Sequence, residues 1–291
     1  MTDSTDDLRQ DIERLYSHPS GEPLPEGASR VVTRLLERLE EGSIRSASHN
    51  EDGTWVAVPW VKQGILVAFR AGKIVPVSGP GAAPVAHGEA SAFLDKHNLP
   101  VREFRIEEGV RMVPGGSAVR RGAFVGAGVV CMPPMYINVG SYVGAGTMID
   151  SHALVGSCAQ IGERVHLSAA AQVGGVLEPI NASPVVIEDD VVVGGNCGVY
   201  EGTVVRRRAV LGAGVILTRG TPVFDLVNER VVRADADHPL EIPENAVVVP
   251  GARSVTSEWG RSSGLSLYTP VIVKYRDART DAATALEDWL R

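Results

Sequence analysis

The side chains that could carry out acid–base chemistry gather in the middle of the chain. Asp150 ends the stretch "GTMID", Glu201 lies in "VYEGT", and His152 and His166 lie between them. A carboxylate or an imidazole within hydrogen-bond reach can take a proton from an attacking nucleophile. Asp150 follows the apolar Ile149, so we expect it to project outward at a turn as the first candidate base. An Asp at a turn can also serve only to bond its own backbone.

Cysteine and metal chemistry are less favoured by the spacing. The chain has three cysteines, Cys131, Cys158 and Cys197, and no Cys-x-x-Cys pair. No base lies at a readable spacing from Cys158, so buried free thiols in a reducing cytoplasm are predicted rather than a nucleophile. The two central histidines are too few for a zinc site built by one chain alone, and no metal is expected.

An apolar residue recurs at every sixth position through the middle of the chain. The step matches neither the helix period of 3.6 nor the strand period of 2 alone. A glycine often follows the apolar residue, which suits the close approach and backbone angles of a tight corner. Each hexad predicts one short strand and one turn, and three hexads close one triangular coil of a parallel β-helix. The seventeen positions, enough for between five and six coils, are Val113, Val119, Val125, Cys131, Ile137, Val143, Ile149, Val155, Ile161, Leu167, Val173, Ile187, Val193, Val199, Val205, Leu211 and Leu217.

The phase of the repeat changes once, between Val173 and Ile187. These positions are fourteen residues apart, which reads as twelve plus a slip of two. A coil that stays in register can place extra residues only in an outward loop. We therefore expect a loop within 174–186, "GGVLEPINASPVV", beside the groove where chemistry would occur.

The flanks of the repeat follow other patterns. A helix is predicted over 28–41, a turn, strand and further helix or strand over 52–70, a loop at 79–84, a polar arm at 227–244, a strand at 266–276 and a helix at 280–291. The hexads are predicted to end at Leu217. The expected organisation is an N-terminal α+β domain (1–110), a β-helix (111–253) with an arm or hairpin at about 219–246, and a short C-terminal β/α extension (254–291).

Composition narrows the function classes. Apolar residues make up 44% of the 291 residues, which favours a sizeable core over disorder. The net charge of −7 argues against nucleic acid as the main partner. The first ten residues are acidic and polar, unlike a signal peptide, and no run of 18 apolar residues suggests a membrane span. A cytoplasmic protein is expected.

The repeat and its flanks resemble one family. The stretches "MYINVGSYVGAGTMIDSHALVGSCAQIGERVHL", "PVVIEDDVVVGGNCGVYEGTVVRRRAVLGAGVILTRGT" and "LLERLEEGSIRSASHNEDGTWVAVPWVKQGILVAFR" resemble tetrahydrodipicolinate N-succinyltransferases over roughly residues 30–255. The resemblance implies a mainly β fold, a left-handed parallel β-helix of hexapeptide repeats. It also implies a homotrimer with sites between neighbouring β-helices, small-molecule substrates, succinyl-CoA as co-substrate and no tightly bound cofactor.

The resemblance also assigns roles to residues. Asp150 matches the catalytic acid/base. The better-known members carry a second acid at a position where this chain has Gly198, so Glu201 is the nearest replacement. Substrate-binding roles fall on Arg111, Asn138, Asp150, Ser157 and Glu178. Contacts to the acyl-CoA fall on Gly174, Gly175, Arg206, Ala213 and Gly214, although the basic run that contains Arg206 is equally typical of a solvated face.

Other functions remain open at this point. A tetrahydrodipicolinate N-acetyltransferase or another hexapeptide acyltransferase would show the same repeat, because the spacing does not place the donors that would select succinate. A non-catalytic hexapeptide scaffold, or a zinc enzyme with ligands on successive coils, is the third reading.

Overall fold

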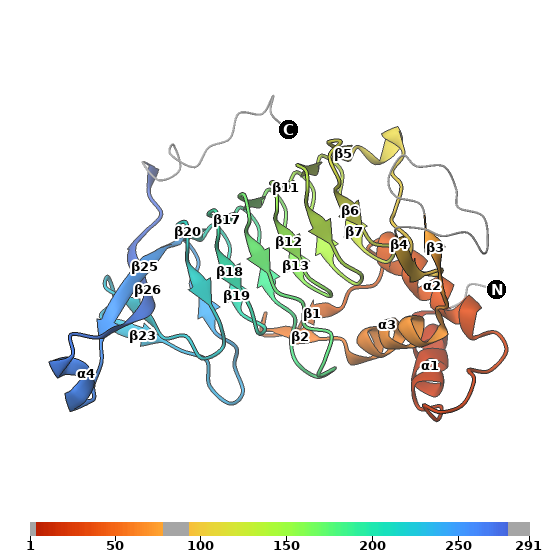
Figure 1. The fold of residues 1–291 in the computed structure, drawn as a ribbon, viewed down its shortest axis with the longest axis horizontal. Coiled ribbons are helices and arrows are strands. Elements are labelled where there is room, and N and C mark those ends of the chain that lie inside the picture. The colour runs from red at the N-terminus through yellow and green to blue at the C-terminus, as the bar shows by residue number, and fades with distance from the viewer. Residues whose placement is uncertain (1–3, 78–92, 279–291) are drawn as a thin grey trace.

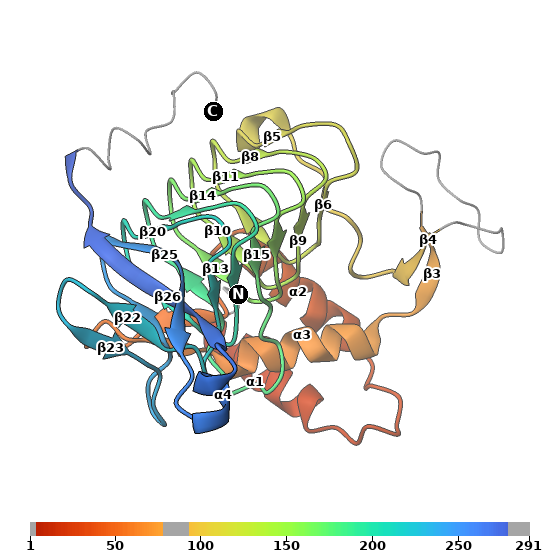
Figure 2. The ribbon, with the colours of Figure 1, turned by 60° about the vertical axis from the view of Figure 1, so that its left-hand side comes forward.

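The computed structural model describes residues 4–77 and 93–278. The loop expected at 79–84 and the helix expected at 280–291 lie outside these residues. A long three-sided β-helix fills the centre, with helices against it near its first coils and a β extension at its other end (Figures 1 and 2). The prediction of a parallel β-helix is therefore confirmed.

Three parallel sheets form the sides of the β-helix, named here faces 1 to 3 in chain order. Face 1 contains β5 (Arg111–Met112), β8 (Val130–Cys131), β11 (Met148–Ile149), β14 (His166–Leu167), β17 (Val192–Val193), β20 (Val210–Leu211) and β25 (Ala246–Ser254). Face 2 contains β6 (Ala118–Val119), β9 (Tyr136–Ile137), β12 (Leu154–Val155), β15 (Gln172–Val173), β18 (Gly198–Val199) and β21 (Ile216–Leu217). Face 3 contains β7 (Phe124–Val125), β10 (Tyr142–Val143), β13 (Gln160–Ile161), β16 (Val186–Ile187), β19 (Val204–Val205) and β24 (Glu241–Ile242). The turns between them are called corners 1–2, 2–3 and 3–1, represented in one coil by residues 150–153, 156–159 and 162–165.

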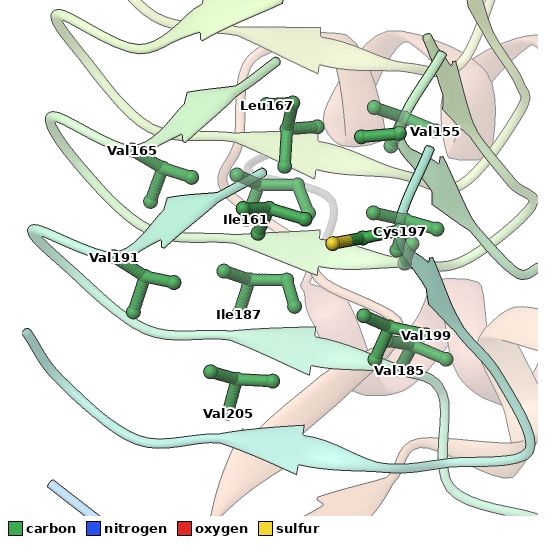
Figure 3. Packing of buried hydrophobic residues seen from close by; sticks show 14 of the residues in the cluster. Val155, Ile161, Val165, Leu167, Val185, Ile187, Val191, Cys197, Val199 and Val205 are labelled. Atoms are coloured by element: carbon green, nitrogen blue, oxygen red, sulfur yellow. The ribbon is translucent and has the colours of Figure 1, made fainter. Parts of the chain in front are cut away.

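The apolar hexad positions stack inside the coil. Ile149 pairs in register with Leu167, and Val155 with Val173, so each residue lies over its equivalent eighteen positions on. Sixteen of the seventeen predicted positions are at most 5% exposed. A second inward column, two residues earlier in each hexad, carries smaller side chains such as Val165, Val191 and Cys197 (Figure 3). Large and small side chains therefore alternate around the coil and fill it closely.

Two positions in each corner have separate backbone requirements. The glycine after the apolar residue is needed for close approach: a Cβ on Gly144 would lie 2.5 Å from the backbone of Gly162. The left-handed conformation falls two residues later, at His152 (φ 62°) and Arg164 (φ 54°), for example. From the sequence, close approach and unusual backbone angles were both expected at the glycine. In the structure, these two requirements fall on different residues of the corner.

The prediction for Val113 is wrong. Met112, and not Val113, pairs with Cys131, because the first coil has one residue more than eighteen. Val113 is consequently half-buried at the rim.

The predicted slip of two is also an underestimate. Val173 and Ile187 belong to consecutive strands, where six residues is the rule, so the insertion has eight residues. A change of phase reveals an insertion only as a remainder after division by six, which explains the error. The expected outward loop is present between β15 and β16.

The repeat does not end at Leu217. Ile242 lies over Val205 and Val248 over Leu211, so two further hexad positions follow the arm. The arm contains a hairpin, β22 (Val223–Asp225) and β23 (Arg230–Val232). The predicted strand at 266–276 is confirmed as β26 (Ser266–Tyr275), which pairs with β25, and α4 (Glu258–Ser262) precedes it.

The N-terminal segment packs on corner 2–3 and on face 3. It contains α1 (Thr5–Tyr16), α2 (Ala28–Glu40), β1 (Ala47–His49), β2 (Trp55–Ala57), α3 (Pro59–Ala71), β3 (Ile74–Val77), β4 (Phe93–Lys96) and a 3₁₀ turn (Ile106–Glu108). The helix predicted at 28–41 and the strand within 52–70 are confirmed. The element after that strand, left open between helix and strand, is the helix α3, and α1 was not predicted. Val139 and Cys158 of the β-helix belong to the same apolar cluster as the three helices.

The hairpin of β1 and β2 covers part of face 3, and the guanidinium of Arg45 makes the main contacts between them. The guanidinium carbon of Arg45 lies 3.7 Å from the ring centre of Tyr142, and its Nε donates to Gln160 at 2.8 Å. Trp55 donates to Glu188 at 3.0 Å. These contacts fix β1 and β2 against the β-helix.

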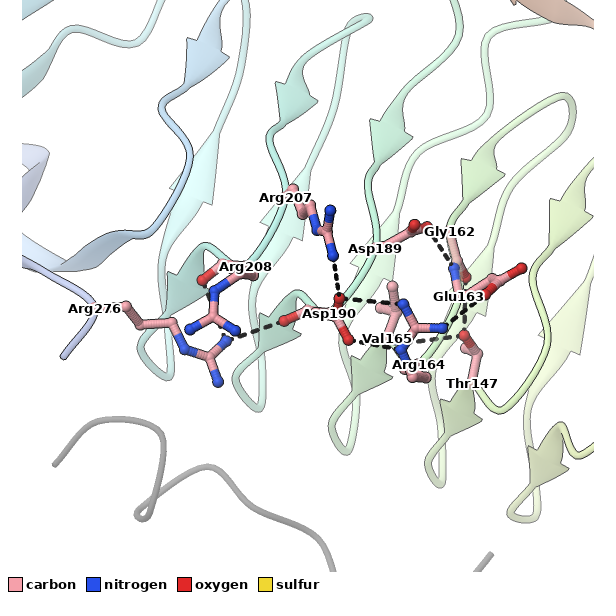
Figure 4. A network of polar contacts seen from close by, with 10 residues as sticks. All are labelled: Thr147, Gly162, Glu163, Arg164, Val165, Asp189, Asp190, Arg207, Arg208 and Arg276. Atoms are coloured by element: carbon pink, nitrogen blue, oxygen red, sulfur yellow. Dashed lines mark hydrogen bonds and ion pairs between the residues drawn. The ribbon is translucent and has the colours of Figure 1, made fainter. Parts of the chain in front are cut away.

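Charged side chains line corner 3–1. Arg164 donates to Asp190 at 2.8 Å, and Arg276 donates to the carbonyls of Asp190 and Arg208 (Figure 4). The hydrogen bond from Arg164 lowers the pKa of Asp190. A carboxyl group whose pKa is lower in the folded than in the unfolded protein stabilises the fold at pH values above its unfolded-state pKa. This contribution is lost as the pH falls through the folded-state pKa.

The inward phase can be tested with a charge at Val155, which is fully buried. Val155→Asp is expected to destabilise the fold by several kcal/mol, because it leaves a carboxylate unpaired in the coil. The control is Leu154→Asp, which places the same charge on the outward face. Circular dichroism with thermal unfolding should show loss of the fold only for the first variant. Equal stability of the two variants would mean that the phase is misassigned.

Candidate active site

Asp150 lies on corner 1–2, directly after β11, with its side chain 33% exposed. The N–H of Ser151 donates to Oδ1 at 2.7 Å, and Oδ2 lies 3.9 Å from Nε2 of His166. His166 comes from the next coil, in register with Met148. The carboxylate is therefore outside the coil, as predicted, and the imidazole of His166 lies beside it, just beyond hydrogen-bond distance.

The other candidates near face 1 are spread along its length. Arg111 is exposed on β5, two strands before β11, and Ala213 and Gly214 follow β20, three strands after it. Five strand spacings of roughly 4.8 Å place β5 and β20 about 24 Å apart. These residues share one side of the molecule with Asp150 but form no single pocket with it.

Corner 2–3 contains a cavity of about 870 Å³, bounded by the loop after β15 and by the arm after β21. Four predicted residues line it: Gly174, Gly175, Glu178 and Glu201. Arg219, at the start of the arm, ties the arm to the corner after β18: its backbone N–H donates to Glu201 at 3.0 Å, and its guanidinium donates to the carbonyls of Asp235 and Ala236 further along the arm.

The charge of this cavity is mostly negative. Glu178, Glu201 and Asp237 line it, and Arg219 brings a cation whose guanidinium is already engaged with arm carbonyls. Such a lining favours an ammonium or amine over a carboxylate. The carboxylates of a dicarboxylate ligand would need cations from elsewhere.

Asn138 and Ser157 lie on the same corner but outside the cavity lining. The side-chain oxygen of Asn138 accepts bonds from the N–H of Val139 at 2.8 Å and from the hydroxyl of Tyr136 at 3.3 Å. The carbonyl of Ser157 accepts a bond from Val176, at the start of the inserted loop. Their observed contacts are local to the corner.

Arg206 lies on corner 3–1, away from both groups. Its guanidinium makes paired bonds to Glu241 at 2.8 Å and a further bond to Glu188 at 2.9 Å. These ion pairs hold β19 to neighbouring strands. The structure therefore does not bring Arg206 together with the other candidate residues.

The two candidate acids do not meet within one chain. Asp150 is on corner 1–2, whereas Glu201 is on corner 2–3, two coils further along the axis. A strand of face 2 separates the two corners. A site that uses both carboxylates has to combine surfaces from different chains.

Thiol and metal chemistry find little support in the described residues. All three cysteines are buried, and burial raises the pKa of Cys131 to about 12 and of Cys158 to about 11. Such thiols are inert at neutral pH. Within 4–77 and 93–278, no group of three His, Cys, Asp or Glu side chains is placed to hold a metal ion.

No helix in these ranges is long and apolar enough to cross a membrane.

Comparison with known proteins decides the family. The model of the tetrahydrodipicolinate N-succinyltransferase N-terminal region matches residues 7–71, and the hexapeptide repeat of succinyl-transferases matches residues 184–219. A 2,3,4,5-tetrahydropyridine-2,6-dicarboxylate N-succinyltransferase of Polynucleobacter asymbioticus is 41% identical over 94% of this chain and 93% of its own length. The chain belongs to this N-succinyltransferase family. Its members are named N-succinyltransferases, and an N-succinyltransferase is an acyltransferase.

A further relative and a solved structure are also similar to the chain. The N-succinyltransferase of Wolbachia sp. subsp. Brugia malayi is 34% identical over 98% of both chains. A solved structure from Campylobacter jejuni, described as a 2,3,4,5-tetrahydropyridine-2-carboxylate N-succinyltransferase, superposes with a TM-score of 0.55 at 17% identity. The superposition covers 84% of this chain but only 62%, less than two thirds, of the Campylobacter chain. It supports the fold alone. The expected fold class, a left-handed β-helix of hexapeptide repeats, is confirmed.

Gly198, the position for which the resemblance implied a second acid, is covered by an aromatic ring. A Cβ at Gly198 would lie 2.4 Å from Cε2 and 2.8 Å from the hydroxyl of Tyr200, and one at Gly174 would lie 2.7 Å from Cδ1 of the same ring. Tyr200 therefore occupies the space that a side chain at 198 would need. Glycine at 174 and 198 is explained by this ring.

Sequence reasoning missed Tyr200, Arg219 and Asp237 as parts of the cavity. Tyr200 is adjacent to Glu201, and a glycine two residues before an aromatic residue was the available signal. Arg219 and Asp237 belong to the arm, whose path back over corner 2–3 has no sequence periodicity.

The contact between Tyr200 and Gly198 can be measured by a double-mutant cycle. Gly198→Ala is expected to be destabilising beside Tyr200 and close to neutral in a Tyr200→Ala background, with a coupling of roughly 0.5–3 kcal/mol. Denaturant unfolding of the wild type, both single variants and the double variant gives this coupling. Additive effects would show that the ring does not lie on Gly198.

Proposed function

We propose that the chain transfers the succinyl group of succinyl-CoA to tetrahydrodipicolinate, giving N-succinyl-2-amino-6-oxopimelate and CoA, in the diaminopimelate route to lysine. The observation that carries this proposal is 41% identity over 94% of the chain to an enzyme named for this reaction. The outward Asp150 in the coil supplies the acid–base group that the reaction needs.

The chemistry requires one proton to leave the nucleophile. The ring nitrogen of the hydrated acceptor attacks the thioester carbonyl, a C–N bond forms, and the C–S bond breaks to release CoA. The ring bond between this nitrogen and the hydroxyl-bearing carbon then breaks: the hydroxyl loses its proton as the carbon becomes the 6-oxo group, and the nitrogen gains a proton as the chain opens. Asp150 takes the proton from the nitrogen and returns one to the departing sulfur. The imidazole of His166 lies 3.9 Å from the carboxylate, beyond hydrogen-bond distance, and a small movement of either side chain would let it share the proton.

Binding divides between the two sides of the molecule. The acidic cavity on corner 2–3 suits the nitrogen-bearing part of the acceptor, with Glu178 and Glu201 as partners. Exposed Arg111 suits a substrate carboxylate. Gly174, Gly175 and the Ala213–Gly214 turn present backbone close to the surface, where an extended acyl-CoA could lie.

Assembly follows from the separation of these groups. Asp150 and the corner 2–3 cavity face different sides of one chain, so we propose a homotrimer whose sites lie between neighbouring β-helices. Because succinyl-CoA and the acceptor are metabolites of the cytoplasm, we place the enzyme there.

The proposed function is tested by release of free thiol from succinyl-CoA and from acetyl-CoA, with the acceptor present and absent. Asp150→Asn is expected to lower kcat by about 10²-fold or more, the usual size of a general-base contribution. Its thermal unfolding should be unchanged, because the side chain is outside the coil. Glu163→Gln, which changes an exposed carboxylate on corner 3–1, is the control.

Near-wild-type turnover of Asp150→Asn would remove this residue from the mechanism. Faster thiol release from acetyl-CoA than from succinyl-CoA would replace the proposed acyl donor.

The role of Glu201 is separated from its contact with the arm by Glu201→Gln. The amide oxygen can still accept the bond from the N–H of Arg219, so the arm should stay in place while the charge is lost. We expect lower turnover with nearly unchanged KM for succinyl-CoA. A silent substitution, measured at one pH beside Asp150→Asn, would leave Asp150 as the only acid/base.

A further inference from the structure

Lys62 on α3 is an unusual side chain for its position. It is fully buried, and it is among the largest side chains under 2% exposed in the described residues. Its Nζ donates to the carbonyl of Ala182 at 2.5 Å, and no ion pair is formed with a carboxylate of the described chain. Burial lowers the pKa of Lys62. An isolated buried amine is costly, so its contact with Ala182 is the feature to explain.

Ala182 belongs to the twelve-residue connection between β15 and β16, which contains the eight-residue insertion and which we call the 174–185 loop. This loop has no partner strand of its own. Its start is fixed where the N–H of Val176 donates to the carbonyl of Ser157 at 3.1 Å. Leu177 then packs against the apolar cluster of the N-terminal helices.

The loop is therefore held at two points by the helical segment. Leu177 provides an apolar contact before its tip, and Lys62 provides a hydrogen bond after it. Between these points lie Glu178, Pro179 and Asn181, which line the acidic cavity on corner 2–3. Glu178 thus lies between the two anchors.

We propose that Lys62 is a positioning residue, which holds the 174–185 loop against α3 so that Glu178 faces the amine of the acceptor. This proposal rests on the proposed function for the identity of the acceptor. It assigns to α3, far from the reacting atoms in sequence, control over acceptor binding. Gly174 and Gly175, which we assign to the acyl-CoA, precede the bond from Val176 to Ser157 that fixes the start of the loop. Acyl-CoA binding and the proton transfer at Asp150 are therefore not expected to depend on Lys62.

A single lysine suits this task for a physical reason. A buried backbone carbonyl without a donor is costly, and a long side chain from a rigid helix can reach a loop that has no ladder of its own. Replacement of Lys62 by methionine keeps a stem of four apolar atoms but removes the ammonium donor. Because an apolar side chain tolerates this buried position, the variant is expected to fold.

The anchor is tested directly by hydrogen exchange in the full-length protein without ligand. Lys62→Met should speed exchange in peptides covering 176–184 by about tenfold or more, with little change in the coils of the β-helix. The matched control is Ser46→Ala. Ser46 is also buried and also joins the N-terminal segment to corner 2–3, through the carbonyls of Gly140 and Cys158, but it does not touch the loop.

Three outcomes of the exchange experiment decide whether Lys62 anchors the loop. Faster exchange of the loop in Lys62→Met alone supports the anchor. Unchanged exchange in Lys62→Met overturns it, and equal loosening in Ser46→Ala assigns the effect to general stability and also overturns it. If Lys62→Met does not fold, Lys62→Gln, which is too short to reach Ala182, is measured instead.

The functional part is read from a split between kinetic constants. Lys62→Met should raise KM for tetrahydrodipicolinate by about tenfold, because a misplaced binding group weakens acceptor binding, and leave KM for succinyl-CoA unchanged. Leu177→Ala, which removes the other anchor without altering charge, should give the same split. Equal rises in both KM values, or a fall in kcat alone, would contradict a positioning role. Absence of succinyl transfer by the wild type would refute the proposed function, while the exchange result would still decide whether Lys62 holds the loop.

Discussion

The eighteen-residue register of the coil is the constraint on which the rest of the structure depends. Ile149 lies over Leu167 and Val155 over Val173 because every strand pairs with its equivalent one turn later. The inner columns are buried, so a strand can neither lose nor gain a residue without breaking this stack. Any additional chain has to leave at a corner.

Both large departures from the register leave at corner 2–3, and together they form the walls of the acidic cavity. The 174–185 loop supplies Glu178, and the arm after β21 supplies Arg219 and Asp237. Below them, glycine at 174 and 198 leaves room for the ring of Tyr200. The same rule that makes the coil uniform thus concentrates irregular, polar chain at one place, where a binding site can form.

The fold was largely predictable because its repeat is written in the apolar positions themselves. Leu167 or Ile187 could be placed inward from spacing alone. Val113 could not, since one additional residue in the first coil changes the phase at the rim without leaving a mark in the pattern. The length of the loop and the return of the repeat at Ile242 were hidden for a related reason: the period records insertions only modulo six.

The candidate site was predictable in a different way. An outward Asp150 follows from the position after an inward residue, but its neighbour His166 comes from the next coil and is visible only once coils are stacked. Arg206 illustrates the opposite case, because a basic run gives no sign that Glu188 and Glu241 already bind it. Contacts between coils, and between the arm and a corner, depend on geometry that sequence spacing does not contain.

The central claim is that one chain does not hold a complete site, because Asp150 and the acidic cavity lie on different corners. It is tested most directly by measuring the molar mass of the active species, using light scattering and sedimentation at the enzyme concentrations of the thiol-release assay. The account predicts three times the 30.8 kDa mass of the chain, with activity per chain falling on dilution in step with the fraction of assembled trimer. A fully active species of 30.8 kDa would contradict it.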